Sequence, residues 1–405
     1  MSNTPNIRFK GFSDAWEQRK LGDCLSEITY GFTNPMSDTE DGPWKLTAKD
    51  IVNGKIDYSS ARHTSQIEYE SLTDKSKPLI GDLLLTKDGT LGRTAIVDTE
   101  NICINQSVAL LRFNEKCSAQ YAKTLLDTPM YQKQMLDDAG GGTIKHIYIT
   151  KVDKMFIPVP SMREQEQLVC FFDNLDNLIT LHQHKYNEML ILKRYLLQKM
   201  FPKRGRKVPE IRFDGFKEEW KQYKCKDIFD KVGVPVKLKK DGLYREIGIR
   251  SHGKGIFHKD EVTGAEIGNK RVFWIEQNCF ILNIVFAWER AVAKTTKNEI
   301  GMIASHRFPM YKPKTGIVDL DYITKFFITD QGKDILEMAS PGGAGRNKTL
   351  GQKEFAESNI LIPSYEEQIK IGETIKALDE LINLNLFKYE KLKEIKKYML
   401  KNMFV

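Results

Sequence analysis

Two short segments of the sequence combine positive charge, hydrogen-bonding side chains and glycine. They are residues 87–93 (Lys-Asp-Gly-Thr-Leu-Gly-Arg) and residues 250–255 (Arg-Ser-His-Gly-Lys-Gly). Lysine and arginine side chains contact phosphates or donate to the edge of guanine. Glycine lets a backbone approach a ligand closely. Both segments are therefore candidates for contact with a nucleic acid, although each alone is also typical of a solvated turn.

Further polar segments occur at matching places in the two halves of the chain. Residues 105–107 (Asn-Gln-Ser) match residues 305–307 (Ser-His-Arg), and glycine-rich stretches precede Lys145 and Lys348. Asn and Gln pair bidentately with adenine, and cations beside small residues suit phosphates. This recurrence favours DNA contact for the whole set. The predicted DNA-contacting residues are Thr47, Lys49, Lys87, Asp88, Thr90, Arg93, Gln106, Ser107, Thr143, Lys145, Arg250, Ser251, His252, Lys254, Arg290, His306, Arg307, Arg346, Asn347 and Lys348.

Sequence signatures of catalysis are absent. The chain has no GxGxxG after a predicted strand, no phosphate-binding GxxxxGK[ST], no GxSxG and no HExxH. Its seven histidines do not cluster with cysteine at the spacing of metal ligands. We therefore predict no catalytic residue, no metal and no cofactor bound by this chain. A nuclease site built from scattered carboxylates is the alternative that such a search leaves open.

Composition places the chain among folded proteins with more than one domain. It has 405 residues, 41% of them hydrophobic, and a net charge of +8, which is a mild indication of a polyanionic partner. No apolar run is long enough to span a membrane. Six scattered cysteines without a CxxC pair indicate reduced thiols, and hence a cytoplasmic location.

The sequence contains one module twice. Ile-Arg-Phe-Lys-Gly-Phe at 7–12 recurs as Ile-Arg-Phe-Asp-Gly-Phe at 211–216. Pro-Ser-Met-Arg-Glu-Gln at 160–165 recurs as Pro-Ser-Tyr-Glu-Glu-Gln at 363–368. The two offsets differ by one residue, so two nearly equal modules stand in tandem. Between these blocks the copies diverge, which indicates a common frame with two different contact surfaces; drift after an old duplication is the alternative.

Each module ends in a predicted long helix. Apolar residues recur at spacings of three and four over residues 168–200 and 371–403, which is typical of a seam for one partner helix. The Ser-x-x-Glu spacings at 161–164 and 364–367 predict capping boxes at the two helix starts. We expect the helices to form an antiparallel pair within the chain; pairing between two chains is the alternative.

The bodies that precede these helices are predicted to mix α and β structure. Residues 81–97 form a strand, an Asp-Gly turn and a second strand. Further strands are expected at 102–113 and 278–287, and short helices at 119–137 and 319–338. Trp44, Trp274 and Trp288 are expected in the cores rather than stacked on bases. The predicted fold is α+β, with two mixed α/β domains separated by two long antiparallel coiled-coil helices and related by a pseudo-two-fold repeat. The predicted segments are residues 1–158 (first domain), 159–205 (central helix and linker), 206–361 (second domain) and 362–405 (distal helix).

The repeated motifs resemble the specificity subunit of type I restriction-modification systems. The resemblance rests on the Ile-Arg-Phe-x-Gly-Phe openings with Trp16 and Trp220, on Gly-Asp-Leu-Leu at 81–84, and on the Pro-Ser-x-x-Glu-Gln helix starts. It covers essentially the whole chain. It implies a non-catalytic subunit in which each recognition domain binds one half of a split, asymmetric site in double-stranded DNA.

The same resemblance implies the partners of the chain. The helices would dock two modification subunits, which carry the S-adenosylmethionine chemistry, and restriction subunits would join that core. ATP and Mg²⁺ are likewise expected on partner subunits. Three alternatives stay open: an enzyme with a degenerate site, a protein scaffold that binds no DNA, and an antagonist that occupies the modification subunits. Recognition domains vary too much for the family to predict the bases bound, the spacer or the order of the half-sites.

Overall fold

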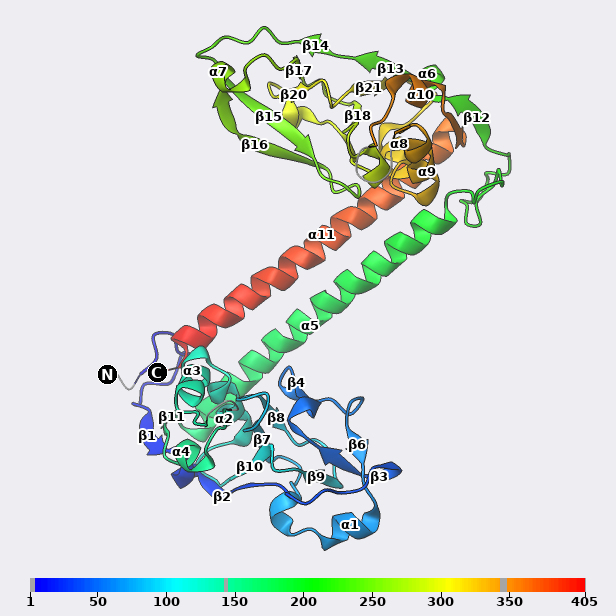
Figure 1. The fold of residues 1–405 in the computed structure, drawn as a ribbon. Coiled ribbons are helices and arrows are strands. Elements are labelled where there is room, and N and C mark those ends of the chain that lie inside the picture. Colours follow the sequence, from blue (N-terminus) through cyan, green and yellow to red (C-terminus); the bar gives the residue numbers. More distant parts are fainter. Residues whose placement is uncertain (1–3, 142–144, 343–347, 405) are drawn as a thin grey trace. The chain divides into compact units, whose positions relative to one another are not determined.

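The computed structural model describes residues 4–141, 145–342 and 348–404 (Figure 1). The chain divides into two compact units. The first unit is Met1–His182 with Phe387–Val405, and the second unit is Gln183–Leu386. Each unit therefore contains one body, part of its own long helix and part of the long helix of the other copy. No helix among the described residues has the length and apolar character needed to cross a bilayer.

The body of the first unit is built on a four-stranded antiparallel sheet. Its order is β2 (Leu25–Tyr30), β10 (Val108–Phe113), β7 (Leu83–Thr86) and β8 (Thr94–Ile96). Because side chains alternate along a strand, Leu83 and Leu85 pack in one buried cluster with α2 (Ala119–Leu126) and α3 (Pro129–Asp137). Leu84 packs in a second cluster, on the other face of the sheet.

A smaller sheet covers that second face. Its order is β6 (Arg62–His63), β3 (Thr39–Leu46) and β9 (Ile102–Ile104), with β3 and β9 parallel. The sheet β2-β10-β7-β8 is thus buried on both sides, which explains its nearly continuous apolar strands. The remaining elements before the helix are η1 (Leu21–Cys24), η2 (Ala48–Asp50), η3 (Asp74–Ser76), β4 (Ile51–Val52), β5 (Lys55–Ile56), α1 (Gln66–Ser71) and α4 (Ile149–Asp153).

The body of the second unit repeats this plan. Its four-stranded sheet has the order β13 (Phe229–Val232), β21 (Met310–Pro313), β18 (Phe280–Leu282) and β19 (Val292–Lys294). Phe280 and Leu282 pack against α8 (Leu320–Phe326) and α9 (Asp330–Met338), and Ile281 packs on the opposite face.

The second sheet of this body is larger than its counterpart. Its order is β14 (Val234–Pro235), β17 (Val272–Trp274), β20 (Ile303–Ser305), β15 (Leu243–Ile249) and β16 (Ile256–Thr263), with β15 parallel to β20. The remaining short elements are α6 (Cys225–Ile228), α7 (Gly264–Ile267), α10 (Gln352–Glu357), η4 (Ala287–Glu289) and η5 (Lys297–Glu299).

A two-stranded ladder leads from each body into its long helix. β1 (Glu17–Lys20) pairs with β11 (Phe156–Val159), which precedes α5 (Met162–Lys199). β12 (Lys221–Lys224) pairs with β22 (Asn359–Ile362), which precedes α11 (Tyr365–Asn402).

The two long helices are antiparallel in each unit. In the first unit Phe172, near the start of α5, stacks on Phe404, just past the end of α11, at 5.6 Å between ring centroids. In the second unit Phe201, just past the end of α5, lies in one core cluster with Ile371, near the start of α11. The pairing therefore lies within the chain, and the predicted α+β fold with two antiparallel helices is confirmed.

Two local predictions were confirmed only in part. The carboxylates of Glu164 and Glu367 accept hydrogen bonds from Arg8 and Arg212, respectively, so they do not complete the predicted capping boxes. At the start of α11 the Ser364 hydroxyl does accept from the N–H of Glu367, at 3.4 Å. Trp44 is partly buried and packs against a core cluster of the first unit, as expected. Trp274 is 36% exposed and Trp288 is only partly buried, whereas Trp16 and Trp220 are fully buried in the cores. The sequence did not distinguish Trp274 and Trp288 from core tryptophans because apolar segments that end at a surface have the same composition as core segments.

Candidate nucleic-acid interface

Four polar segments of the first unit converge at the ends of the central strands. The backbone N–H of Lys87 donates to the carbonyl of Ser107 at 2.9 Å, and the N–H of Ile147 donates to the carbonyl of Lys87 at 2.9 Å. The N–H of Ala48 donates to the Ser107 hydroxyl at 2.9 Å. The structure thus brings together the predicted residues at 47–49, 87–93, 106–107 and 145, which lie far apart in sequence.

The second unit uses the same backbone frame. The N–H of Ile284 donates to the carbonyl of Arg307 at 3.0 Å, and the N–H of Leu350 donates to the carbonyl of Ile284 at 2.8 Å. These two bonds match those of Lys87 and Ile147 in the first unit. Since Lys348 precedes Leu350 by two residues and Lys145 precedes Ile147 by two, the two lysines occupy equivalent positions.

The two cation-rich segments at 87–93 and 250–255 do not occupy equivalent positions in the two copies. The hairpin that contains residues 87–93 joins β7 to β8, and its counterpart joins β18 to β19 over residues 283–291. The turn at 250–255 instead follows β15, which matches β3 because each pairs in parallel with an equivalent strand. The counterpart of this turn is therefore the segment that contains Lys49.

The turn at 250–255 nevertheless contacts the 283–291 loop. The N–H of His252 donates to the carbonyl of Glu289, and the N–H of Gly253 to that of Arg290, both at 2.8 Å. His252 and Arg290 have φ values of 62° and 60°, in the left-handed region that costs most side chains about 1–2 kcal/mol. Such strain persists where the surroundings enforce it, and it is concentrated at functional sites.

Three candidate side chains of the first unit are engaged within the protein. Lys87 Nζ lies 2.7 Å from Asp88 Oδ2 and 5.2 Å from the centre of the Tyr30 ring. Asp88 Oδ1 also lies 2.6 Å from His146 Nδ1. Arg93 Nη1 donates to the carbonyl of Ile51 at 3.0 Å. These contacts hold the hairpin in one conformation, so its charged groups are presented with little freedom.

Two other candidates belong to the frame. The Thr47 hydroxyl donates to Asp50 Oδ2 at 2.8 Å in a capping box at η2. The Ser107 hydroxyl donates to Asn105 and accepts from the Ala48 N–H. Both hydroxyls position backbone and are poorly placed to contact a base. Within residues 4–141 and 145–182, the candidates whose side chains have no partner are Lys49, Thr90, Gln106 and Lys145.

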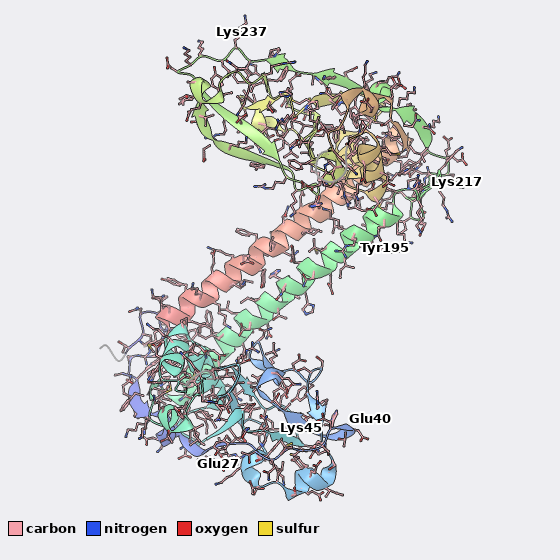
Figure 2. All side chains as sticks on the ribbon, viewed as in Figure 1. Glu27, Glu40, Lys45, Tyr195, Lys217 and Lys237 are labelled. Atoms are coloured by element: carbon pink, nitrogen blue, oxygen red, sulfur yellow. The ribbon has the colours of Figure 1, made fainter. Side chains whose placement is uncertain are left out.

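A small hollow lies beside this surface. Its volume is about 360 Å³, and Thr47, Lys49 and Asn105 are among the residues that line it. Lys45, which is labelled in Figure 2, also lines this hollow. Its ammonium group donates to the carbonyls of Met36 and Ser37 at 3.0 and 2.9 Å.

In the second unit the candidates divide in the same way. Ser251 donates to Glu289 at 2.8 Å, Arg290 to the Ile328 carbonyl at 2.8 Å, and Lys348 to Glu337 at 2.7 Å. The guanidinium of Arg250 lies 5.0 Å from the centre of the Phe257 ring. The candidates with no side-chain partner in the described part of this unit are His252, Lys254, His306 and Arg307, all exposed. Thr143, Arg346 and Asn347 lie outside the described residues.

Some residues of this surface were missed by the sequence analysis. His146 binds Asp88, and Phe286 is exposed on the loop that matches the 87–93 hairpin. The position of His146, one residue after the predicted Lys145, was the available signal. Phe286 gave none, because it ends an apolar run that is typical of a buried strand.

The buried cysteines belong to the cores. Burial raises the pKa of the Cys225 thiol to about 12 and that of Cys103 to about 12, so these thiols are protonated at neutral pH. Across the described residues no group of three or more His, Cys, Asp or Glu side chains could hold a metal ion.

Comparisons with known proteins agree on one family. The model of the type I restriction modification DNA specificity domain matches residues 14–190 and again 217–397. The chain is 22% identical over 407 aligned positions to a Methanocaldococcus jannaschii protein named for the specificity subunit of type I restriction enzyme MjaX, covering 94% of this chain and 91% of that one. It is 26% identical over 160 positions to the EcoBI specificity subunit of Escherichia coli, covering 38% of this chain and 33% of the relative. The crystal structure of the type I restriction-modification S subunit from M. genitalium has a TM-score of 0.54 at 14% identity, with 99% of both chains covered, and so shares the fold.

Proposed function

Since the chain belongs to the family of type I restriction-modification DNA specificity subunits, with two recognition domains, we propose that each domain binds one half of a bipartite, asymmetric DNA site. Members of this family are specificity subunits and not catalytic ones. The role that we propose for this chain is therefore to select the DNA sequence on which its catalytic partners act.

One observation carries the proposal. The two units have the same backbone frame, in which Lys87 and Ile284 make equivalent hydrogen bonds, but they present different side chains from it. Gln106 stands on the turn of the first unit, and His306 and Arg307 stand on that of the second. Amide and guanidinium groups favour different bases in the major groove. Two surfaces of one architecture and different chemistry are what an asymmetric site requires.

The division of the chain follows from this function. We assign residues 1–158 and 206–361 to the two recognition domains, and residues 159–205 and 362–405 to the helices and linker. Two bodies on one chain multiply specificity, because binding of the first half-site raises the local concentration of the second.

The helices offer a surface for protein partners. On α5 the residues Ile191, Leu192 and Tyr195 are exposed, and Tyr195 is labelled in Figure 2. On α11 Leu384 and Phe387 are exposed, the last by 67%. Exposed apolar groups on a long helix are typical of a subunit interface. We assign them to the docking of two modification subunits, with restriction subunits joining that complex. S-adenosylmethionine, ATP and Mg²⁺ would then be bound by those partners, and the complex would work in the cytoplasm.

A methylation map tests the proposal. The chain is co-expressed with the modification subunit of its own operon in a host that lacks restriction, and methylated adenines are located across the genome. We expect one bipartite, asymmetric motif that disappears when this chain is omitted. If a complex assembles without producing any motif, the scaffold and antagonist alternatives replace this proposal.

A further inference from the structure

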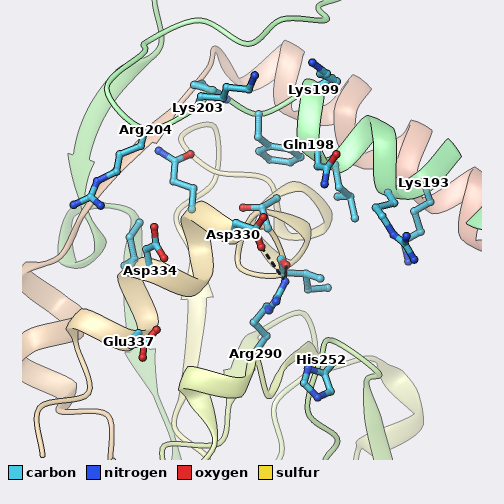
Figure 3. Close-up of a pocket in the computed structure, with 18 of the residues that line it drawn as sticks. Lys193, Gln198, Lys199, Lys203, Arg204, His252, Arg290, Asp330, Asp334 and Glu337 are labelled. Carbon is cyan, nitrogen blue, oxygen red and sulfur yellow. Dashed lines mark hydrogen bonds and ion pairs between the residues drawn. The ribbon is translucent and has the colours of Figure 1, made fainter. Parts of the chain in front are cut away.

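A large groove lies in the second unit, next to the strained turn at His252. It has a volume of about 1330 Å³, and it is lined by the last turns of α5, the linker after α5, the turn at 252–254, Arg290 and α9 (Figure 3). The groove therefore joins the predicted DNA-contacting residues of this unit to residues of a helix and linker that lie outside the recognition domain.

The basic residues of the groove fall into two groups. Lys193 binds Asp379 at 2.5 Å, and Lys199 and Lys203 both bind Glu210. Hydrogen bonds from these two lysines hold the pKa of Glu210 at about 2, so the carboxylate is ionised and offsets their charge at neutral pH. These lysines are committed to partners within the protein.

The basic residues of the second group have no partner within the described part of the protein. Within the described part of the second unit, Arg194, Arg204 and Lys254 form no ion pair and no side-chain hydrogen bond, and all three are exposed. They come from α5, from the linker and from the turn. Cations that hold no internal partner are the ones available to displace counterions from a phosphate backbone.

We propose that Arg194 and Arg204, together with Lys254, bind the phosphate backbone of the duplex that the second recognition domain occupies. The inference rests on the proposed function and adds α5 and its linker to the DNA-binding surface. His252 and Arg290 also line the groove, so the same stretch of duplex would touch the base-contacting turn and the helix. Such contacts fix the position of the DNA without selecting its sequence.

The acidic side of the groove sets the path of the backbone. Glu337 is paired with Lys348, and Asp330 lies 3.6 Å from Arg290 and is 83% exposed on its side chain. Asp334 has no partner among the described residues. These carboxylates all lie on α9 and repel phosphate, so the backbone follows the wall formed by α5 and the linker. Removing the charge of Asp334 should therefore strengthen binding, the opposite of removing Arg194.

The test measures DNA affinity against salt concentration. The probe is a duplex with the motif found by the methylation map, beside a duplex of scrambled sequence, and the protein is the full complex with its modification subunit. The variants are Arg194→Gln, Arg204→Gln and Asp334→Asn. Arg206→Gln is the matched control, because Arg206 is an exposed arginine of the same linker that does not line the groove.

Each arginine variant should lower the slope of log affinity against log salt by about 0.9, and weaken binding about eightfold at 0.1 M salt on both duplexes. The methylated motif should stay the same. Asp334→Asn should tighten binding by about fivefold at low salt, and Arg206→Gln should match the wild type.

Three results would overturn the inference while the proposed function stands. The first is an unchanged slope in both arginine variants. The second is an equal loss in Arg206→Gln, which would mean that only net charge matters. The third is loss of complex assembly in Arg194→Gln with normal DNA binding by the complex that does form, which would make the groove a protein interface. If the wild-type complex produces no motif and prefers neither duplex, the proposed function fails instead.

Discussion

Arg8 and Glu164 form a bidentate ion pair across 156 residues of sequence, with Nε–Oε1 and Nη2–Oε2 distances of 2.7 and 2.8 Å. The pair recurs in the second unit as Arg212 and Glu367, with the same two distances. The opening motif of each module thus holds the first turn of the helix that ends the module. The repeated residues that identify the family form the frame of each unit.

Replacing these arginines should destabilise each unit separately. Arg8→Met leaves the carboxylate of Glu164, whose side chain is 2% exposed, buried without its cation, and we expect a loss of about 3–5 kcal/mol. Arg212→Met should cost about 1 kcal/mol more, because Trp16 donates to Glu164 at 3.1 Å whereas the indole N–H of Trp220 has no partner among the described atoms. Hydrogen exchange measured peptide by peptide shows which unit has lost stability in each variant.

The control for this experiment is Lys391→Met, which removes an exposed pair with Glu394 and should change stability by less than about 1 kcal/mol. Equal effects of all three substitutions would contradict the role assigned to the buried pairs.

The sequence predicted the frame well because the frame is repeated. Matching blocks at two nearly equal offsets predicted two modules, and the three-and-four spacing of apolar residues predicted the paired helices. The glutamine of each repeated Pro-Ser-x-x-Glu-Gln block also has a structural role. Gln165 accepts from the N–H of Ser118 at 2.9 Å, and Gln368 accepts from the N–H of Asp319 at 2.9 Å, so each ties a long helix to the start of α2 or α8.

The contact surface was less predictable because it is assembled from distant segments. The pairing of Asp88 with His146 joins residues 58 apart, and no periodicity signals it. The similar composition of residues 87–93 and 250–255 did not show that these segments follow different strands, which the parallel pairing of β15 with β20 establishes. Arg194 gave no signal at all, because a cation on a long helix is typical of a solvated face.

The contact between Asp379 and two lysines predicts a pH dependence of the second unit. Burial alone would raise the pKa of Asp379, but hydrogen bonds from Lys193 and Lys325 outweigh it and leave the pKa below its ordinary value. Stability from this carboxylate is therefore complete above the unfolded pKa of about 3.9 and is lost as the pH falls through the lower folded value.

Asp379→Asn should lower the urea midpoint of the second unit by a constant amount above about pH 5, and the gap should narrow below about pH 4. Asp176→Asn is the matched control, since Asp176 binds Lys396 across the helices at 2.6 Å but is 48% exposed. Its effect should stay within about 1 kcal/mol. A difference in urea midpoint between wild type and Asp379→Asn that stays constant down to pH 2 would contradict the assigned contacts.

His252→Gly should separate stability from DNA binding. Glycine accepts φ of 62° without strain, and the exposed imidazole forms no side-chain hydrogen bond or ion pair in the described structure, so we expect a gain of up to about 1 kcal/mol. DNA affinity should fall. His306→Gly, which removes an exposed imidazole outside the left-handed region, should lower both stability and affinity. A loss of stability in His252→Gly would show that the turn is unstrained.

Gln106→Ala should relax one position of the half-site bound by the first unit. The Gln106 N–H is fixed by the carbonyl of Phe32 at 2.8 Å, while the side chain is exposed. A lost bidentate contact corresponds to about 1–3 kcal/mol of discrimination between bases. Ser107→Ala removes a hydroxyl of the frame and should cost about 1 kcal/mol of stability with an unchanged motif. A methylation map of each variant distinguishes the two outcomes, and a change in the other half-site would contradict the assignment.

Exchanging residues 206–358 for those of another family member should change one half-site and leave the other intact. The exchanged segment contains Arg212, which must pair with the resident Glu367, and Lys325, which binds the resident Asp379. It also supplies Tyr322, whose ring stacks on the resident Phe201 at 5.6 Å.

A donor that keeps these three residues should fold on the resident helices, whereas a donor without the arginine should be unstable for the reason given for Arg212→Met. Methylation mapping of the hybrid gives the result. Changes in both half-sites would mean that the two domains do not bind DNA independently.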